Sequence, residues 1–118
     1  MLAAAALSLA VMAPHFYEQA RQTAPEVIVI DVTRVTPPAG KTYGACRVEG
    51  RVAKVERGRR YRAGQAVSIA VSCALPGADY PDGGTLWKDM ASLRRSAHGR
   101  AFLGADGRIV MSQYDILP

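Results

Sequence analysis

Apolar and polar positions alternate along two central runs of the chain, and this alternation predicts two β-strands. In residues 45–57 the apolar or small set is Cys46, Val48, Gly50 and Val52, and the set between them is Arg47, Glu49, Arg51 and Ala53. In residues 66–75 the corresponding sets are Val67, Ile69, Val71 and Cys73, and Ala66, Ser68, Ala70 and Ser72. A period of two residues places one set on a buried face and the other outside. The two runs predict a long antiparallel hairpin whose turn lies in residues 57–65.

Val55 departs from this alternation, because it is apolar but falls on the outer face of its strand. A bulge or strong coil near Gly50 or Lys54 would return Val55 to the core. Small curled sheets need such bends. We therefore expect the strand in residues 45–57 to be bent rather than flat.

The remaining pattern predicts two further strands, one on each side of a helix, and a terminal strand. Residues 26–36 are rich in β-branched side chains and lie between prolines, which predicts a strand. Residues 85–98 have apolar residues at helical spacing, with Thr85 as N-cap and Gly99 as the stop. Residues 100–104 and 108–117 flank an Ala-Asp-Gly turn and predict a terminal hairpin.

The N-terminus has an apolar run, residues 2–13, that is interrupted only by Ser8. This run is shorter than the ~20 residues of a membrane-spanning helix and suits the hydrophobic region of a signal peptide. We therefore expect export to the periplasm or the exterior, and no stable membrane span after processing. Residues 1–24 would form the signal peptide or a leader helix, and residues 25–118 a single domain. No Lys or Arg precedes the run, so an N-terminal helix packed on the domain remains the alternative.

The only two cysteines, Cys46 and Cys73, lie in the two alternating strands. Both fall on the apolar face of the predicted hairpin, at the end away from its turn. One disulfide across the base of the hairpin would suit an oxidising compartment. Two buried free thiols, or a metal or redox pair, are the alternatives, although the chain has no C-x-x-C spacing.

Taken in order, the predicted elements are three strands, a helix and two strands. This order resembles the OB-fold, a five-stranded Greek-key barrel with one helix between its third and fourth strands. The resemblance covers residues 26–117 and implies a mainly-β barrel. The spacing of Cys, Val and Gly in residues 46–73 also looks like netrin-like and tissue-inhibitor-like modules. Those modules carry more disulfides and an N-terminal cysteine, so no inhibitor residue is transferred to this chain.

The net charge of +5 favours anionic partners, and basic residues concentrate at the turn of the predicted hairpin. The candidate binding residues there are Arg57, Arg59, Arg60, Tyr61 and Arg62. The partner would be a protein or an anionic polymer of the cell envelope. The alternative interpretation is that these charges only solvate an exposed turn and prevent edge-to-edge association.

The sequence is also compatible with two other functions. The row of small residues on the outer face of residues 66–72 leaves room for a partner or a second copy in an assembly. Single-stranded nucleic acid is the other candidate, but the expected outer face has no aromatic residue for base stacking. No catalytic motif is present, and the two carboxylates of Asp79 and Asp82 are fewer than a calcium ion needs. We expect a binding protein without catalysis, metal or cofactor.

Overall fold

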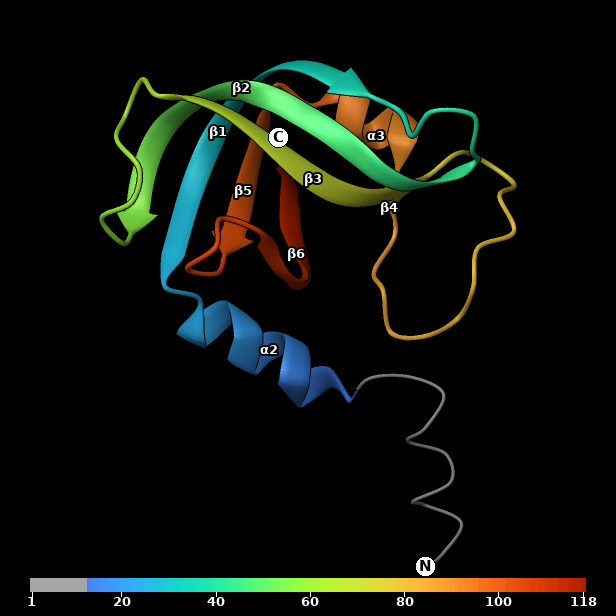
Figure 1. Cartoon of the computed structure of the whole chain (residues 1–118), viewed down its shortest axis with the longest axis horizontal. Helices are drawn as coiled ribbons and strands as arrows, with labels where there is room; N and C mark the ends of the chain where they lie inside the picture. Colours follow the sequence, from blue (N-terminus) through green and yellow to red (C-terminus); the bar gives the residue numbers. More distant parts are fainter. Residues whose placement is uncertain (1–12) are drawn as a thin grey trace, which may run out of the picture.

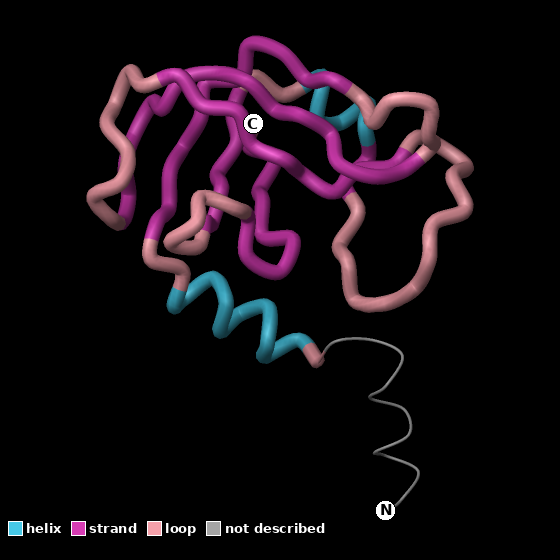
Figure 2. Tube along the Cα trace, viewed as in Figure 1, coloured by secondary structure: helices cyan, strands magenta, loops and turns pink. Residues whose placement is uncertain are grey.

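A curled six-stranded sheet dominates the computed structural model, which describes residues 13–118 (Figures 1 and 2). The strands are β1 (Glu26–Thr36), β2 (Tyr43–Arg57), β3 (Ala66–Ala74), β4 (Lys88–Asp89), β5 (His98–Leu103) and β6 (Ile109–Leu117). The helices are α2 (Pro14–Thr23) and α3 (Met90–Arg95). The strand order is β4-β3-β2-β1-β5-β6, and only the β3–β4 pair is parallel. The predicted mainly-β class is confirmed.

The sheet differs in detail from the predicted five-stranded barrel. It contains the additional short strand β4, which pairs only with the end of β3. The sheet ends at β4 and β6, and no backbone ladder joins β6 to β3, although the two approach each other. The result is a half-barrel that stays open between β3 and β6 (Figure 2).

The predicted faces of β2 and β3 are confirmed. Seven residues of the expected inner face are buried: Cys46, Val48, Gly50, Val52, Ile69, Val71 and Cys73. The pairing of β1 with β2 skips Ala53 and Glu56, so β2 is bulged twice along this ladder. The first bulge reverses the alternation after Val52, and Val55 packs against the core as expected.

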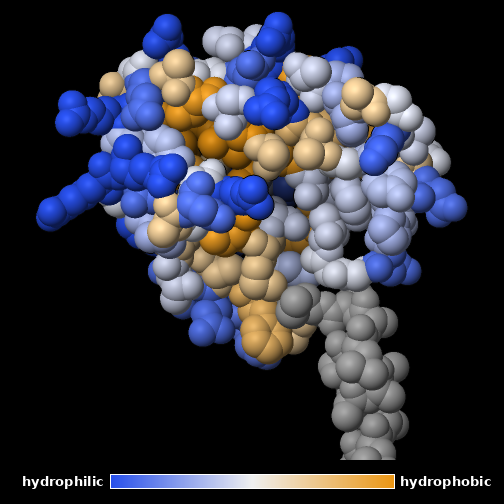
Figure 3. Space-filling view, in the orientation of Figure 1, coloured by the Kyte–Doolittle hydropathy of each residue, from blue (hydrophilic) through white to orange (hydrophobic). Residues whose placement is uncertain are grey.

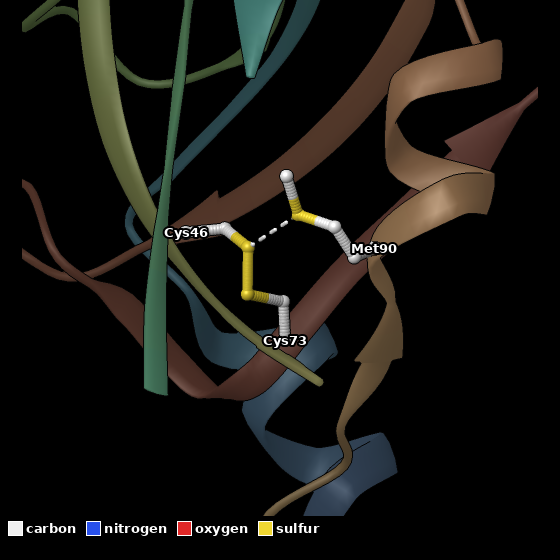
Figure 4. Close-up of a disulfide and its surroundings, with 3 residues drawn as sticks. All are labelled: Cys46, Cys73 and Met90. Atoms are coloured by element: carbon white, nitrogen blue, oxygen red, sulfur yellow. Dashed lines mark hydrogen bonds between the residues drawn. A yellow bond between two sulfur atoms is a disulfide. The ribbon is translucent and has the colours of Figure 1, made fainter. Parts of the chain in front are cut away.

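Cys46 and Cys73 form a disulfide across the adjacent strands β2 and β3, as predicted. Their Cα atoms are 5.7 Å apart, and both side chains are fully buried. Met90, the first residue of α3, closes over the bridge, with its Sδ 3.1 Å from Cys46 Sγ (Figure 4). The bridge and α3 therefore share one end of the core.

The helix predicted in residues 85–98 is wrong at both ends. The observed α3 spans only Met90–Arg95, and its N-cap is Asp89, whose carboxylate accepts a bond from Ser92 N at 3.0 Å. Thr85 precedes an extended segment that adds β4 to the edge of β3. Gly99 lies within β5 against Tyr114, where any side chain would overlap the phenol ring. Tertiary pairing at both ends thus overrides the local helical spacing.

The terminal hairpin forms as predicted, but β6 is strongly irregular. Ala101 and Leu103 are two residues apart on β5. Their partners on β6, Tyr114 and Ile109, are five residues apart, so β6 contains extra residues between these two pairs. The extra residues form a bulge, in which Met111 and Ser112 have φ of 44° and 63°. Beyond the bulge, Tyr114 returns to the core.

Residues 14–23, part of the predicted leader, form α2, and this helix packs against β6 below the sheet (Figure 1). Arg21 forms a bidentate ion pair with Asp115 and lies over the ring of Phe102, 4.1 Å from its centroid. Tyr17 donates to the carbonyl of Gly84. The predicted signal run falls mostly on residues 1–12, which lie outside the described part. Neither helix within residues 13–118 has the length and apolarity needed to cross a bilayer.

Candidate functional site

The β2–β3 connection, residues 58–65, folds back onto the turn between β5 and β6. Arg60 donates from Nη1 to the carbonyl of Ala105 in that turn, and its backbone N–H donates to Glu26 Oε1 at 3.1 Å. A side chain at Gly107 would meet Tyr61 Oη and the Arg60 guanidinium. The connection is therefore packed against a second loop and is not an isolated finger.

The five predicted binding residues divide by what their side chains contact. Arg57 Nη1 donates to the carbonyls of Arg21 and Ala24 at 2.9 and 2.8 Å, where α2 ends. Arg60 and Tyr61 hold the connection against the turn. Arg59 and Arg62 are exposed, and within residues 13–118 their side chains form no hydrogen bond or ion pair. Only Arg59 and Arg62 thus remain available for a partner.

A groove of about 450 Å³ separates the outer face of β3 from the β5–β6 turn. One side is formed by Arg47 of β2 and by Ser68, Ala70 and Ser72 of β3, and the other side by Gly107, Arg108, Ile109 and Ser112. No carboxylate lines this groove. The Arg47 side chain extends from β2 onto β3, where its Nη1 donates to Ser68 Oγ at 2.8 Å. Arg108 lies next to the turn that contacts the β2–β3 connection. The groove therefore adjoins the arginines of that connection.

Arg108 is a candidate residue that the sequence pattern alone does not indicate. The sequence shows that Arg108 follows the predicted Ala-Asp-Gly turn. It does not show that this turn contacts the β2–β3 connection, because that contact joins residues far apart in the chain. Figure 3 shows hydrophilic side chains extending from the side of the molecule where Figure 1 places this connection. We use the name arginine surface for Arg47, Arg59, Arg62 and Arg108.

A neighbouring hollow on the outer face differs because its charged side chains bond to other groups of the protein. It has a volume of about 610 Å³ and lies over β1, β2 and β3. Arg34 Nε donates to Glu49 Oε2 at 2.7 Å, and Arg51 Nη1 donates to Gly64 O at 2.9 Å. No aromatic residue lines this hollow or the groove. Base stacking therefore lacks a platform on this face.

Aromatic side chains gather instead at the other end of β3. The Trp87 ring meets Tyr43 edge-on, with centroids 5.4 Å apart, and lies 5.3 Å from the ring of Tyr80. A hollow of about 290 Å³ adjoins this cluster. Trp87 Nε1 is buried and has no partner within the described residues. The cluster closes the end of the sheet beside the disulfide.

Ion pairs fix the β-strands that support the arginine surface. Arg100 binds Glu56 at 2.6 Å and approaches Asp115 at 3.6 Å, and Asp115 also binds Arg21, so β2, β5, β6 and α2 share one network. The hydrogen bond from Arg100 lowers the pKa of Glu56, and the hydrogen bond from Arg21 lowers the pKa of Asp115, each against the opposing effect of burial. The network therefore favours ionised carboxylates.

Within residues 13–118 no group of three or more potential ligands could hold a metal ion. Comparison of the chain with protein families, curated proteins and solved structures finds no match. The interpretation of the site therefore depends on the residues of this chain alone.

Proposed function

We propose that the protein is a non-catalytic binding module for an anionic partner, which it holds on the arginine surface. The observation that carries this proposal is the contact between the β2–β3 connection and the β5–β6 turn. That contact brings Arg59 and Arg62 to the same end of the molecule as Arg108, beside a groove without carboxylates. An acidic protein segment or an anionic envelope polymer fits this surface by charge.

The fold resembles an OB-like barrel, an architecture that suits a binding role. The order β3-β2-β1-β5-β6 among the long strands, with α3 between β3 and β5, supports this assignment. Proteins of this architecture commonly bind ligands on strands and adjoining loops, so the likeness supports binding only by analogy.

Export to an oxidising compartment is the proposed setting. The Cys46–Cys73 disulfide is compatible with the periplasm or the exterior, where such bridges persist. Anionic polymers and proteins of the cell envelope would be the accessible partners there.

Chromatography on an immobilised sulfated polysaccharide tests the proposed function. The double variant Arg59→Ser/Arg62→Ser should elute at lower salt than the wild type, because exposed charges bind an anionic matrix in a salt-dependent way. The matched control is Arg94→Ser/Arg95→Ser, which removes the same charge from the exposed end of α3. Equal shifts for both double variants would contradict a specific surface.

A single-stranded oligonucleotide, titrated at low and high salt, separates this function from nucleic-acid binding. We expect weak binding that disappears at high salt, because stacking of about 1–3 kcal/mol per base has no platform on the β2–β3 face. Tight binding that survives high salt would favour the nucleic-acid alternative.

Assembly through β3 is a second candidate function. The specific observation is the open gap between β3 and β6, where the outer residues Ala66, Ser68 and Ala70 are exposed. Replacement of Ala70 by Arg would place a long charged side chain on this face. Self-association that is present in the wild type and lost in Ala70→Arg would support it, whereas a monomeric wild type without a captured partner would exclude it.

A further inference from the structure

The edge of β3 that faces β6 carries backbone groups without strand partners. The β2–β3 ladder has no register shift, and it ends with bonds from Val52 N to Gln65 O and from Leu75 N to Thr42 O, both 2.8 Å. Since bonding alternates along an antiparallel pair, the odd-numbered residues of β3 bond to β2. The even-numbered residues, Ala66, Ser68, Ala70 and Ser72, direct their N–H and C=O groups to the other side.

No strand within residues 13–118 covers this edge between Ala66 and Ser72. The parallel strand β4 pairs only with Cys73 and Ala74. Natural proteins usually protect an open edge with charged residues or proline. The β3 sequence AVSIAVSCA contains neither, and its β-branched residues suit an extended chain. The edge therefore lacks a paired strand, although β6 approaches β3 on this side.

The groove beside this edge has room for an added chain, and its charged lining is positive, which favours an acidic chain. Its volume of about 450 Å³ corresponds to about three residues of an extended peptide at ordinary strand and sheet spacings. Arg47 and Arg108 lie on its two sides, and no carboxylate offsets them within the groove. A second copy of the chain would bring its own arginines to the same place, so like charges oppose self-pairing.

We propose that β3 accepts an acidic, extended segment of a partner protein as an added strand in this groove. The segment would bond through its backbone to Ser68, Ala70 and Ser72, and its carboxylates would meet Arg47 and Arg108. This is the mode in which main-chain bonds provide affinity and alternate side chains provide specificity. The inference rests on the proposed function and names the class of partner for the same surface.

Amide hydrogen exchange, followed by NMR on the full chain, tests the added strand residue by residue. The probe is a blocked peptide in which Glu and Val alternate. Peptide binding should slow exchange at the amides of Ser68, Ala70 and Ser72, while Ile69 and Val71, already bonded to β2, should change little. A peptide that binds without slowing the even-numbered amides would overturn the inference.

N-methylated peptides give a second readout on the wild-type protein, so no variant needs to fold. One peptide is methylated on its Glu amides and the other on its Val amides, because only one alternate set can face β3. One of them should bind at least about tenfold more weakly than the other, since it loses several backbone bonds. Equal affinities would contradict an added strand.

Arginine variants distinguish failure of this inference from failure of the proposed function. Arg47→Ser and Arg108→Ser should each weaken peptide binding in proportion to the charge removed. If they do so while even-numbered amides stay unprotected, the anionic surface stands and the added strand is wrong. Binding of the sulfated polysaccharide without any binding of the peptide also rejects the added strand. If neither probe binds, both proposals fail.

Discussion

Removal of the Arg21 side chain tests whether α2 is an integral part of the fold. The Arg21 guanidinium bonds to both carboxylate oxygens of Asp115, at 2.8 and 2.9 Å, and lies 4.1 Å from the Phe102 ring centroid. The two ionic side chains are 36% and 27% exposed, so solvent screens part of their attraction. We assign about 1 kcal/mol to the pair and about 1 kcal/mol to the aromatic contact. Arg21→Ala should therefore lower the free energy of unfolding by about 2 kcal/mol.

Urea unfolding and thermal unfolding of the full chain measure this loss. For a domain of this size, the expected change corresponds to a fall in Tm of about 8 °C. The control Arg94→Ala removes an exposed arginine and should stay within about 0.5 kcal/mol of the wild type. An unchanged midpoint for Arg21→Ala would refute the inference that this contact stabilises the fold.

The same contact predicts a pH dependence. Because the bond from Arg21 lowers the pKa of Asp115 below its ordinary value of 3.8, folding favours the ionised carboxylate. The stabilisation is complete above that ordinary value and is lost as the pH falls through the lowered folded pKa. Comparison of wild type with Asp115→Asn should show a difference at neutral pH that narrows in strong acid. A difference that grows on acidification would contradict this sign.

Two further predictions concern the core and the bend of the sheet. Reduction of the Cys46–Cys73 bridge, or replacement of both cysteines by Ala, should lower the free energy of unfolding by about 3.5 kcal/mol on the chain-entropy account. Urea unfolding with and without reductant measures this loss, and equal midpoints would reject a structural bridge. Gly50→Ala should destabilise the protein by about 1–3 kcal/mol in the same assay, because the added methyl group would overlap the Asp31 carbonyl across the β1–β2 ladder. An unchanged free energy of unfolding would show that this close approach is absent.

Periodic patterns were sufficient to predict the strands and their faces. The alternation in β2 and β3 placed the correct side chains in the core, and the misplaced Val55 indicated a bulge that the structure contains. The helical spacing after Thr85 was misleading, because Met90 and Leu93 are buried while Leu86 is 40% exposed. Pairing of β4 with β3, and of Gly99 with Tyr114, depends on distant partners that a local window cannot include.

The candidate site was predictable only in part for the same reason. The run of arginines in the β2–β3 connection was evident, but their roles depend on contacts with distant segments. Arg57 bonds to the end of α2, and Arg60 bonds to the β5–β6 turn, 45 positions further along the chain. Those contacts remove two arginines from the predicted site and bring Arg108 toward it.

NMR mapping with a soluble anionic polymer tests the central claim most directly. Polyglutamate added to the labelled full chain should shift the backbone amides of residues 58–65, residues 104–112 and β3, and these shifts should reverse as salt is raised. The aromatic cluster around Trp87 and the exposed end of α3 should remain unchanged. Shifts confined to those two regions, or shifts spread evenly over every exposed arginine, would contradict an anionic partner on the arginine surface.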